Sequence, residues 1–170
     1  MNRRTVSSAI GSVIFFVVAP CVVAGLVPWL LTDWETGQLL PVWARFVGGV
    51  VAGIGAVALV HSFIRFVVEG IGTPAPVAPT EKLVVGGLYR HVRNPMYLAV
   101  AATIIGQGLL LSRPVLFGYG LLVGLAMAIF VKLYEEPVLL DQFGSEYEEY
   151  RRSVPGWLPR LRPWSPDGGS

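Results

Sequence analysis

The sequence predicts an all-α polytopic membrane protein that crosses the bilayer about four times. Of its 170 residues, 54% are hydrophobic and only 14% are charged, whereas a soluble domain of this size has roughly a quarter of its residues charged. Mean hydropathy is +0.61. The apolar residues are also gathered into four long runs instead of being dispersed. By length we expect one domain, covering residues 1–170.

Each of the four runs is long enough to cross a membrane. A bilayer core of about 30 Å needs roughly 17–25 helical residues. We therefore expect membrane helices at about 8–31, 43–67, 96–112 and 114–134. The runs are too long for strands, and the first is longer than the apolar part of a signal peptide. Two glycine pairs with three intervening residues, Gly49 with Gly53 and Gly120 with Gly124, predict close helix contacts.

The basic residues predict the orientation of the chain. Eleven of the 13 lysines and arginines fall on one predicted side of the membrane. They are Arg3, Arg4, Arg65, Lys82, Arg90, Arg93, Lys132, Arg151, Arg152, Arg160 and Arg162. Cytosolic loops carry this excess, so we expect both termini in the cytosol. The net charge of +2, scattered between apolar runs, argues against nucleic acid as a partner.

The segment after the fourth run predicts a cytosolic cap at 135–160. A new helix is expected to begin at Glu135-Glu136-Pro137, because proline suits a first helical turn, and to stop at Gly144. A second short helix follows, for which Ser145 to Glu148 has the spacing of a capping box. We expect Trp157 and Trp164 at the membrane interface and a flexible tail at 163–170.

The densest group of polar residues lies in a predicted cytosolic loop, 70–95, directly before the third helix. Arg90, His91, Arg93 and Asn94 supply hydrogen-bond donors there, and Glu135 and Glu136 lie at the matching end of the fourth helix. A cationic cluster facing paired carboxylates predicts a pocket for a zwitterionic ligand.

Two neighbouring features are less specific. The proline-rich stretch 72–80 is either a stiff cover or a spacer. His61, Arg65 and Glu69 share one helix face, which either lines the pocket or holds a simple ion pair. Only two histidines exist, on different segments, so we expect no metal site.

Two segments resemble a known group of membrane-embedded methyltransferases, which includes isoprenylcysteine carboxyl methyltransferases and phospholipid N-methyltransferases. They are Leu83 to Tyr97 and Glu135 to Tyr150, closing on Val154-Pro155. Their order, separated by one helical hairpin, strengthens the resemblance, which covers roughly 72–161. Histidine is common in the family where this chain has Asn94, and the Arg-Asn-Pro form resembles a bacterial variant. The resemblance therefore implies the bacterial inner membrane as the location. Val131 stands where the eukaryotic carboxyl methyltransferases place an arginine.

The resemblance implies S-adenosylmethionine as cofactor, a lipid or lipid-linked substrate, and a single membrane methyltransferase domain. It assigns catalytic roles to Arg93, Glu135 and Glu136. The implied cofactor-binding residues are Tyr89, His91, Asn94, Pro95, Tyr97, Tyr147 and Tyr150. A carboxylate acceptor would need no base, whereas an amine must lose a proton, for which either glutamate is a candidate. The sequence leaves this choice open.

Two other functions compete with methyl transfer. An integral sterol or isoprenoid reductase that uses NADPH has a related helical arrangement at its C-terminal end, although this chain is short for that class. A non-enzymatic membrane subunit would explain the glycine pairs as contacts with a partner protein. The oligomeric state cannot be read from the sequence.

Overall fold

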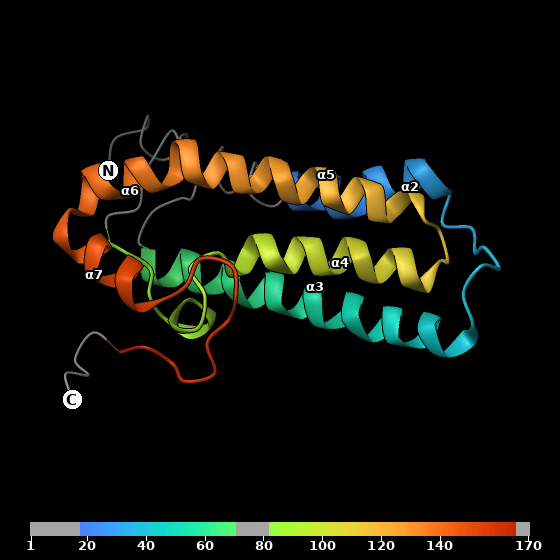
Figure 1. Ribbon diagram of the computed structural model, residues 1–170, viewed down its shortest axis with the longest axis horizontal. Helices are drawn as coiled ribbons and strands as arrows, with labels where there is room; N and C mark the ends of the chain where they lie inside the picture. Colours follow the sequence, from blue (N-terminus) through green and yellow to red (C-terminus); the bar gives the residue numbers. More distant parts are fainter. Residues whose placement is uncertain (1–17, 71–81, 166–170) are drawn as a thin grey trace.

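The computed structural model describes residues 18–70 and 82–165, all helical or irregular. Long helices lie side by side, and two short ones and an extended segment gather at one end (Figure 1). The helices are α2 (Val27–Thr32), α3 (Val42–Gly70), α4 (Pro95–Leu110), α5 (Val115–Phe130), α6 (Glu136–Phe143) and α7 (Ser145–Ser153). The all-α prediction is confirmed for the described residues.

Two apolar helices have the length and composition to span a membrane. One covers Val42–Arg65, and the other runs continuously over Val115–Phe143. Only 17% of the residues in the most apolar window of each are buried, whereas a core helix of a soluble protein would be mostly buried. Two shorter apolar helices, Val18–Thr32 and Pro95–Leu110, pack beside them. The number of four membrane crossings stays a prediction.

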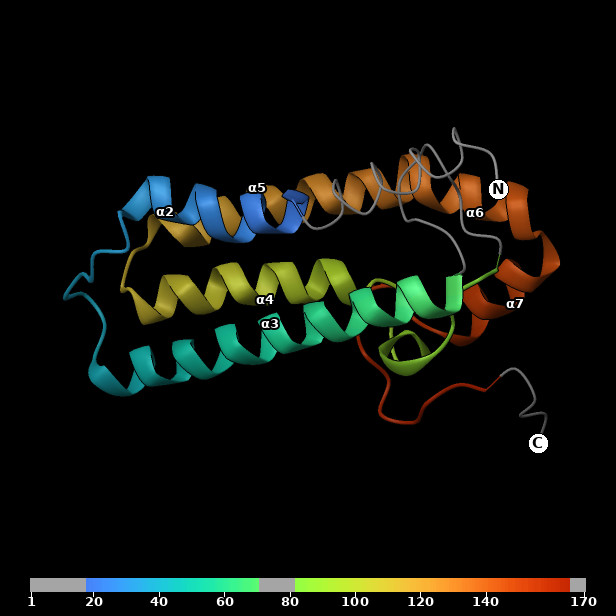
Figure 2. The ribbon, with the colours of Figure 1, turned by 180° about the vertical axis from the view of Figure 1, so that it is seen from behind.

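A tight turn makes α4 and α5 an antiparallel hairpin (Figures 1 and 2). Ser112 in this turn is buried with a left-handed φ of 55°. Its Oγ accepts a hydrogen bond from the Leu40 amide at 2.8 Å, and the Gly37 amide donates to Leu111 at 2.7 Å. The loop before α3 therefore fixes the turn. As a result, the start of α4 and the far end of α5 lie at the same end of the bundle.

The fourth predicted helix does not stop before Glu135, so the prediction that a new helix begins there is wrong. A π-helical turn, Val131–Glu135, joins α5 to α6, and the Glu136 amide donates to the Val131 carbonyl. Pro137 has no N–H, and its ring would clash with the turn before it in a regular helix. The wider turn accommodates that proline, and the chain continues as one helix.

A π-helical turn before a proline also occurs in the first helix, where the turn Val22–Leu26 precedes Pro28. The Val27 amide donates to Val22 and not to Val23, and Pro28 has no N–H to donate to Ala24. The Tyr119 hydroxyl donates to Val23 at 2.8 Å, and Gln107 Nε2 donates to Ala24 at 2.7 Å. The α4–α5 hairpin thus satisfies the backbone of the first helix, a need that is acute without water.

Glycine packing between α3 and α4 uses a different face from the one predicted. A Cβ at Gly48 would meet the Leu110 backbone nitrogen and the Gly106 carbonyl oxygen, the second at 2.7 Å. A Cβ at Gly53 would meet no atom of another described element within 4 Å. Gly124 is equally open, although Gly120 does approach α4. The predicted pairs are therefore wrong at Gly53 and Gly124, because spacing alone does not say which face meets a neighbour.

This difference predicts opposite outcomes for two alanine substitutions in one helix. Gly48→Ala should lower the free energy of unfolding by about 1–3 kcal/mol, because backbone atoms of α4 cannot move aside. Gly53→Ala should be neutral or slightly stabilising, since alanine favours helix over glycine. Thermal unfolding in detergent compares the two variants. Equal losses of stability would contradict the packing described.

The short helix α7 begins without the predicted capping box. Gly144, with φ at 51°, is its N-cap residue, and no side chain caps the helix. The stop of α6 at Gly144 is confirmed, because α6 ends at Phe143. Several predictions lie outside the described residues: the start of the first helix, the proline-rich stretch 72–80, the side chain of Glu69, and the end of the tail at 166–170.

Candidate functional site

The hairpin brings Tyr97, in the first turn of α4, against Glu135 at the far end of α5. The Tyr97 hydroxyl donates to Glu135 Oε2 at 2.7 Å. The second carboxylate oxygen, Oε1, makes no hydrogen bond to residues 18–70 or 82–165. Trp157 lies next to Tyr97, with ring centroids 6.4 Å apart. One oxygen of Glu135 is thus held in place, and the other can accept a proton or a hydrogen bond.

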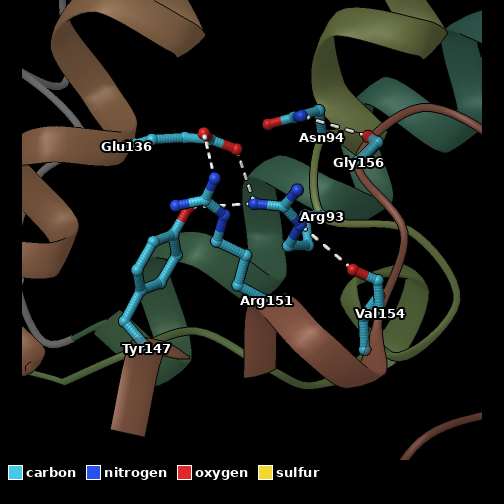
Figure 3. Close-up of polar contacts among 7 residues, drawn as sticks. All are labelled: Arg93, Asn94, Glu136, Tyr147, Arg151, Val154 and Gly156. Carbon is cyan, nitrogen blue, oxygen red and sulfur yellow. Dashed lines mark hydrogen bonds and ion pairs between the residues drawn. The ribbon is translucent and has the colours of Figure 1, made fainter. Parts of the chain in front are cut away.

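Arg93 joins the neighbouring carboxylate to the C-terminal part of the chain (Figure 3). Its Nη1 donates to Glu136 Oε1 at 2.6 Å and to the Tyr147 hydroxyl at 3.0 Å. The two charged side chains are only 14% and 17% exposed. Arg151 approaches Glu136 Oε2 at 3.8 Å from the more exposed side. Because a largely buried ion pair is stable only while both partners are present, Arg93 and Glu136 hold three segments together.

The residues after α7, Val154–Ser165, form an extended segment that we call the strap. It lies along residues 90–94 and bonds to them mostly through its backbone. Arg93 Nε donates to the Val154 carbonyl at 3.0 Å, and the Arg93 amide donates to Pro155 at 2.9 Å. Asn94 Nδ2 donates to the Gly156 carbonyl at 3.0 Å. The strap therefore orients Arg93 and Asn94 together.

The outer half of the strap is fixed in the same way. The Arg160 amide donates to the His91 carbonyl at 2.9 Å, and His91 Nδ1 lies 2.8 Å from the Arg160 carbonyl. The Trp164 amide donates to the Arg90 carbonyl at 2.9 Å, and Arg90 Nε donates to the Trp164 carbonyl at 2.5 Å. These reciprocal contacts make His91 a structural partner of the strap.

Two buried tyrosines of α7 lie beneath this arrangement. The Tyr150 hydroxyl donates to the Tyr89 carbonyl at 2.7 Å, and Tyr147 and Tyr150 pack with Val154 in one apolar cluster. Burial raises the pKa of Tyr150 well above its usual range. Burial also raises the pKa of Tyr147, although the Arg93 guanidinium opposes this. Both hydroxyls are therefore neutral near pH 7, and Tyr147 accepts a bond from Arg93 as a neutral group.

The predicted site residues separate into two sets. The structure brings together Arg93, Asn94, Tyr97, Glu135, Glu136 and Tyr147. The others lie around this cluster: Tyr89 and Tyr150 pack beneath it, Pro95 is buried at the first position of α4, and His91 faces the strap.

Three features of the site were missed from the sequence. The carbonyls of Val154, Pro155 and Gly156 leave no signal in side-chain patterns, because any residue can supply them. Trp157 was assigned only to the membrane interface. Arg151 could have been found, because it lies four residues after Tyr147 in a predicted helix and so shares its face.

The predicted face of α3 contacts the turn before α4. Gly87 has φ at 56°, and a Cβ there would lie 2.8 Å from His61 Nε2 and 3.2 Å from Arg65 Cγ. These two side chains therefore pack on the turn Gly87–Arg90. No group of three metal-ligating side chains occurs among the residues that the structure describes.

Comparisons with known proteins identify the family to which this chain belongs. Residues 43–146 match the sequence model of the phospholipid methyltransferase family, which is more than half of the chain. The protein-S-isoprenylcysteine O-methyltransferase of Schizosaccharomyces pombe is 35% identical over 82 residues. That match covers 46% of this chain and 34% of the relative, so the chain aligns with about a third of the relative's length. No solved structure matches. The resemblance predicted from the sequence is confirmed: the chain belongs to the phospholipid methyltransferase family.

Proposed function

We propose that this protein transfers a methyl group from S-adenosylmethionine to a lipid or lipid-linked acceptor at the cytosolic membrane face. Family membership and one structural observation support this proposal. The adjacent carboxylates Glu135 and Glu136 are held against Tyr97 and Arg93 where a membrane hairpin opens. The proposal includes four membrane crossings, cytosolic termini and one domain. A multi-pass arrangement would put this end of the hairpin beside both the bilayer and the cytosol.

The side chains in the cluster fit the chemistry of this cofactor. S-adenosylmethionine supplies an electrophilic methyl group on a cationic sulfonium, and it carries an ammonium group and ribose hydroxyls. Glu135 Oε1 makes no hydrogen bond within the described chain, and Glu136 Oε2 has only a long ion pair. Carboxylate oxygens suit ammonium and hydroxyl donors, and the rings of Tyr97 and Trp157 suit a cation. Asn94 uses its Nδ2 on the Gly156 carbonyl, so its Oδ1 is a further hydrogen-bond acceptor.

The geometry supports different roles for the three residues predicted to be catalytic. Glu135 has one oxygen fixed by Tyr97 and one available, as a base for an amine acceptor requires. Arg93 uses its guanidinium on Glu136, Tyr147 and Val154. It therefore acts as a positioning residue in this proposal, and Glu136 joins it in fixing the strap.

The acceptor belongs to one of two chemical classes. The Schizosaccharomyces pombe relative is named for methylation of an isoprenylcysteine, and the family for phospholipids. A carboxylate acceptor attacks without losing a proton, whereas an amine needs a base. Both are lipid-linked, which agrees with the large exposed apolar surface of α3 and α5.

Purified protein in nanodiscs should bind S-adenosylmethionine in calorimetry and transfer a labelled methyl group to a component of a lipid extract. Mass spectrometry of the labelled product identifies the acceptor. A ligand that binds only the folded protein raises its melting temperature, so NADPH is tested in parallel. Stabilisation by NADPH alone would favour a reductase. A folded protein that binds neither ligand would end the proposal.

A further inference from the structure

The strap has an outer edge that carries exposed apolar side chains. Leu158 is 80% exposed and Leu161 97%, and Trp157 is 37% exposed. Arg162 follows them and is also exposed. We call Trp157, Leu158, Leu161 and Arg162 the outer edge. In water, exposing two leucines so fully in one short segment forgoes the favourable burial of both.

The backbone of the strap prevents these leucines from turning inward. Residues before them are fixed by the bonds of Pro155 and Gly156 to Arg93 and Asn94. Residues among and after them are fixed by the bonds of Arg160 to His91 and of Trp164 to Arg90. Burying either leucine in the protein would break several of these bonds. The exposure is therefore imposed by the fold, which points to a contact outside the described chain.

The outer edge lies at the level where the helical bundle ends. Both ribbon views show the strap standing out beside the end of α3 and the start of α4 (Figures 1 and 2). All five tryptophans of the chain belong to the two ends of the bundle. Trp29, Trp34 and Trp43 are at one end, and Trp157 and Trp164 are at the other. Tryptophan favours the two membrane–water interfaces, so this distribution places the strap at one of them.

The charge of the strap favours anionic lipid over a neutral surface. Its only charged residues are Arg160 and Arg162. Neither forms an ion pair with a carboxylate of the described residues. Arg160 Nη1 donates to the Ser153 carbonyl at 2.7 Å, and the adjoining Arg90 donates from its guanidinium to the Trp164 carbonyl. Arg162, exposed beside the exposed leucines, matches a surface that has negative headgroups above an apolar layer.

We propose that the outer edge of the strap docks into the bilayer interface at the candidate-site end and engages anionic lipid headgroups. Leu158 and Leu161 enter the upper acyl region, Trp157 lies at headgroup level, and Arg162 contacts phosphate. The proposal depends on the strap alone and holds whether or not the protein transfers methyl groups.

The test measures where Leu161 lies in the full-length protein in nanodiscs. A fluorophore is attached to Leu161→Cys in a Cys21→Ser background, and a matched label at the exposed Ser145 serves as control. Iodide quenches labels in water, and brominated acyl chains quench labels in lipid. We expect the Leu161 label to be quenched by brominated lipid and protected from iodide, and the Ser145 label to show the reverse.

The role of charge is tested with the same fluorophore at Leu161→Cys. At equal mole fraction, bromines on the anionic lipid should quench more than bromines on the zwitterionic lipid. Arg162→Gln should reduce this preference roughly fivefold, the equivalent of the about 1 kcal/mol that one arginine contributes at an anionic surface. A Leu161 label as open to iodide as the Ser145 label would overturn the proposal. Protection from both quenchers would also overturn it, because the edge would then be covered by protein.

Discussion

Replacing Glu135 with glutamine should lower the rate of methyl transfer to an amine acceptor by about 10²–10⁴-fold, the usual contribution of a general base. Glutamine retains a carbonyl oxygen that can accept the Tyr97 hydrogen bond, so the fold should survive. A carboxylate acceptor loses no proton, so its rate should fall much less. Single-turnover rates with each class of acceptor measure the difference.

A matched control exists at the opposite end of the bundle. Glu35 pairs with Arg113 at 3.0 Å and is 74% exposed, so Glu35→Gln makes the same chemical change away from the candidate site. It should leave methyl transfer unchanged. An unchanged rate in Glu135→Gln with both acceptors would remove this residue from the chemistry, whereas a loss in both variants would indicate a general effect on the fold.

Arg93→Ala should cost about 3–5 kcal/mol of stability, because it leaves the Glu136 carboxylate buried without its main partner. The strap and α7 each lose one bond at the same time, since Arg93 Nε holds the Val154 carbonyl of the strap and Nη1 holds Tyr147 of α7. Denaturant unfolding measures the loss. Limited proteolysis at the arginines of the strap should become faster.

Two further variants separate the cause of that loss. If an unpaired carboxylate is responsible, adding Glu136→Gln to Arg93→Ala should restore part of the stability. Arg113→Ala breaks an exposed pair and should cost at most about 1 kcal/mol. A double variant no more stable than Arg93→Ala alone would show that the bonds to the strap, and not the buried charge, account for the effect.

The helices could be predicted from the sequence because their signal is local. A helix in lipid needs an uninterrupted run of apolar residues, and these runs predicted the bounds of α3, α4 and α5 to within a few residues. The approach of Tyr97 to Glu135 was also accessible, because a short turn after α4 makes an antiparallel hairpin and so brings the two polar ends together. The family motifs identified the same two segments.

The errors arose where the outcome depends on a neighbouring segment. Pro137 suggested the start of a helix, but a wider turn before it lets the helix continue. Gly53 fits a contact motif, yet the contact lies on the face of Gly48. The strap was not predicted as a structural element. It is held mostly by hydrogen bonds of its backbone, which any side chain permits, so the sequence carries no pattern for it.

The unbroken helix from Val115 to Glu135 has a mechanical consequence. It spans twenty steps, or about 30 Å, from the turn at Ser112, so a rotation of about 2° there moves its far end by about 1 Å. That displacement exceeds the tolerance of the 2.7 Å bond between Tyr97 and Glu135. Helix tilt responds to the thickness of the surrounding bilayer. In the proposed membrane arrangement, acyl-chain length would therefore act on a single carboxylate through the tilt of one helix.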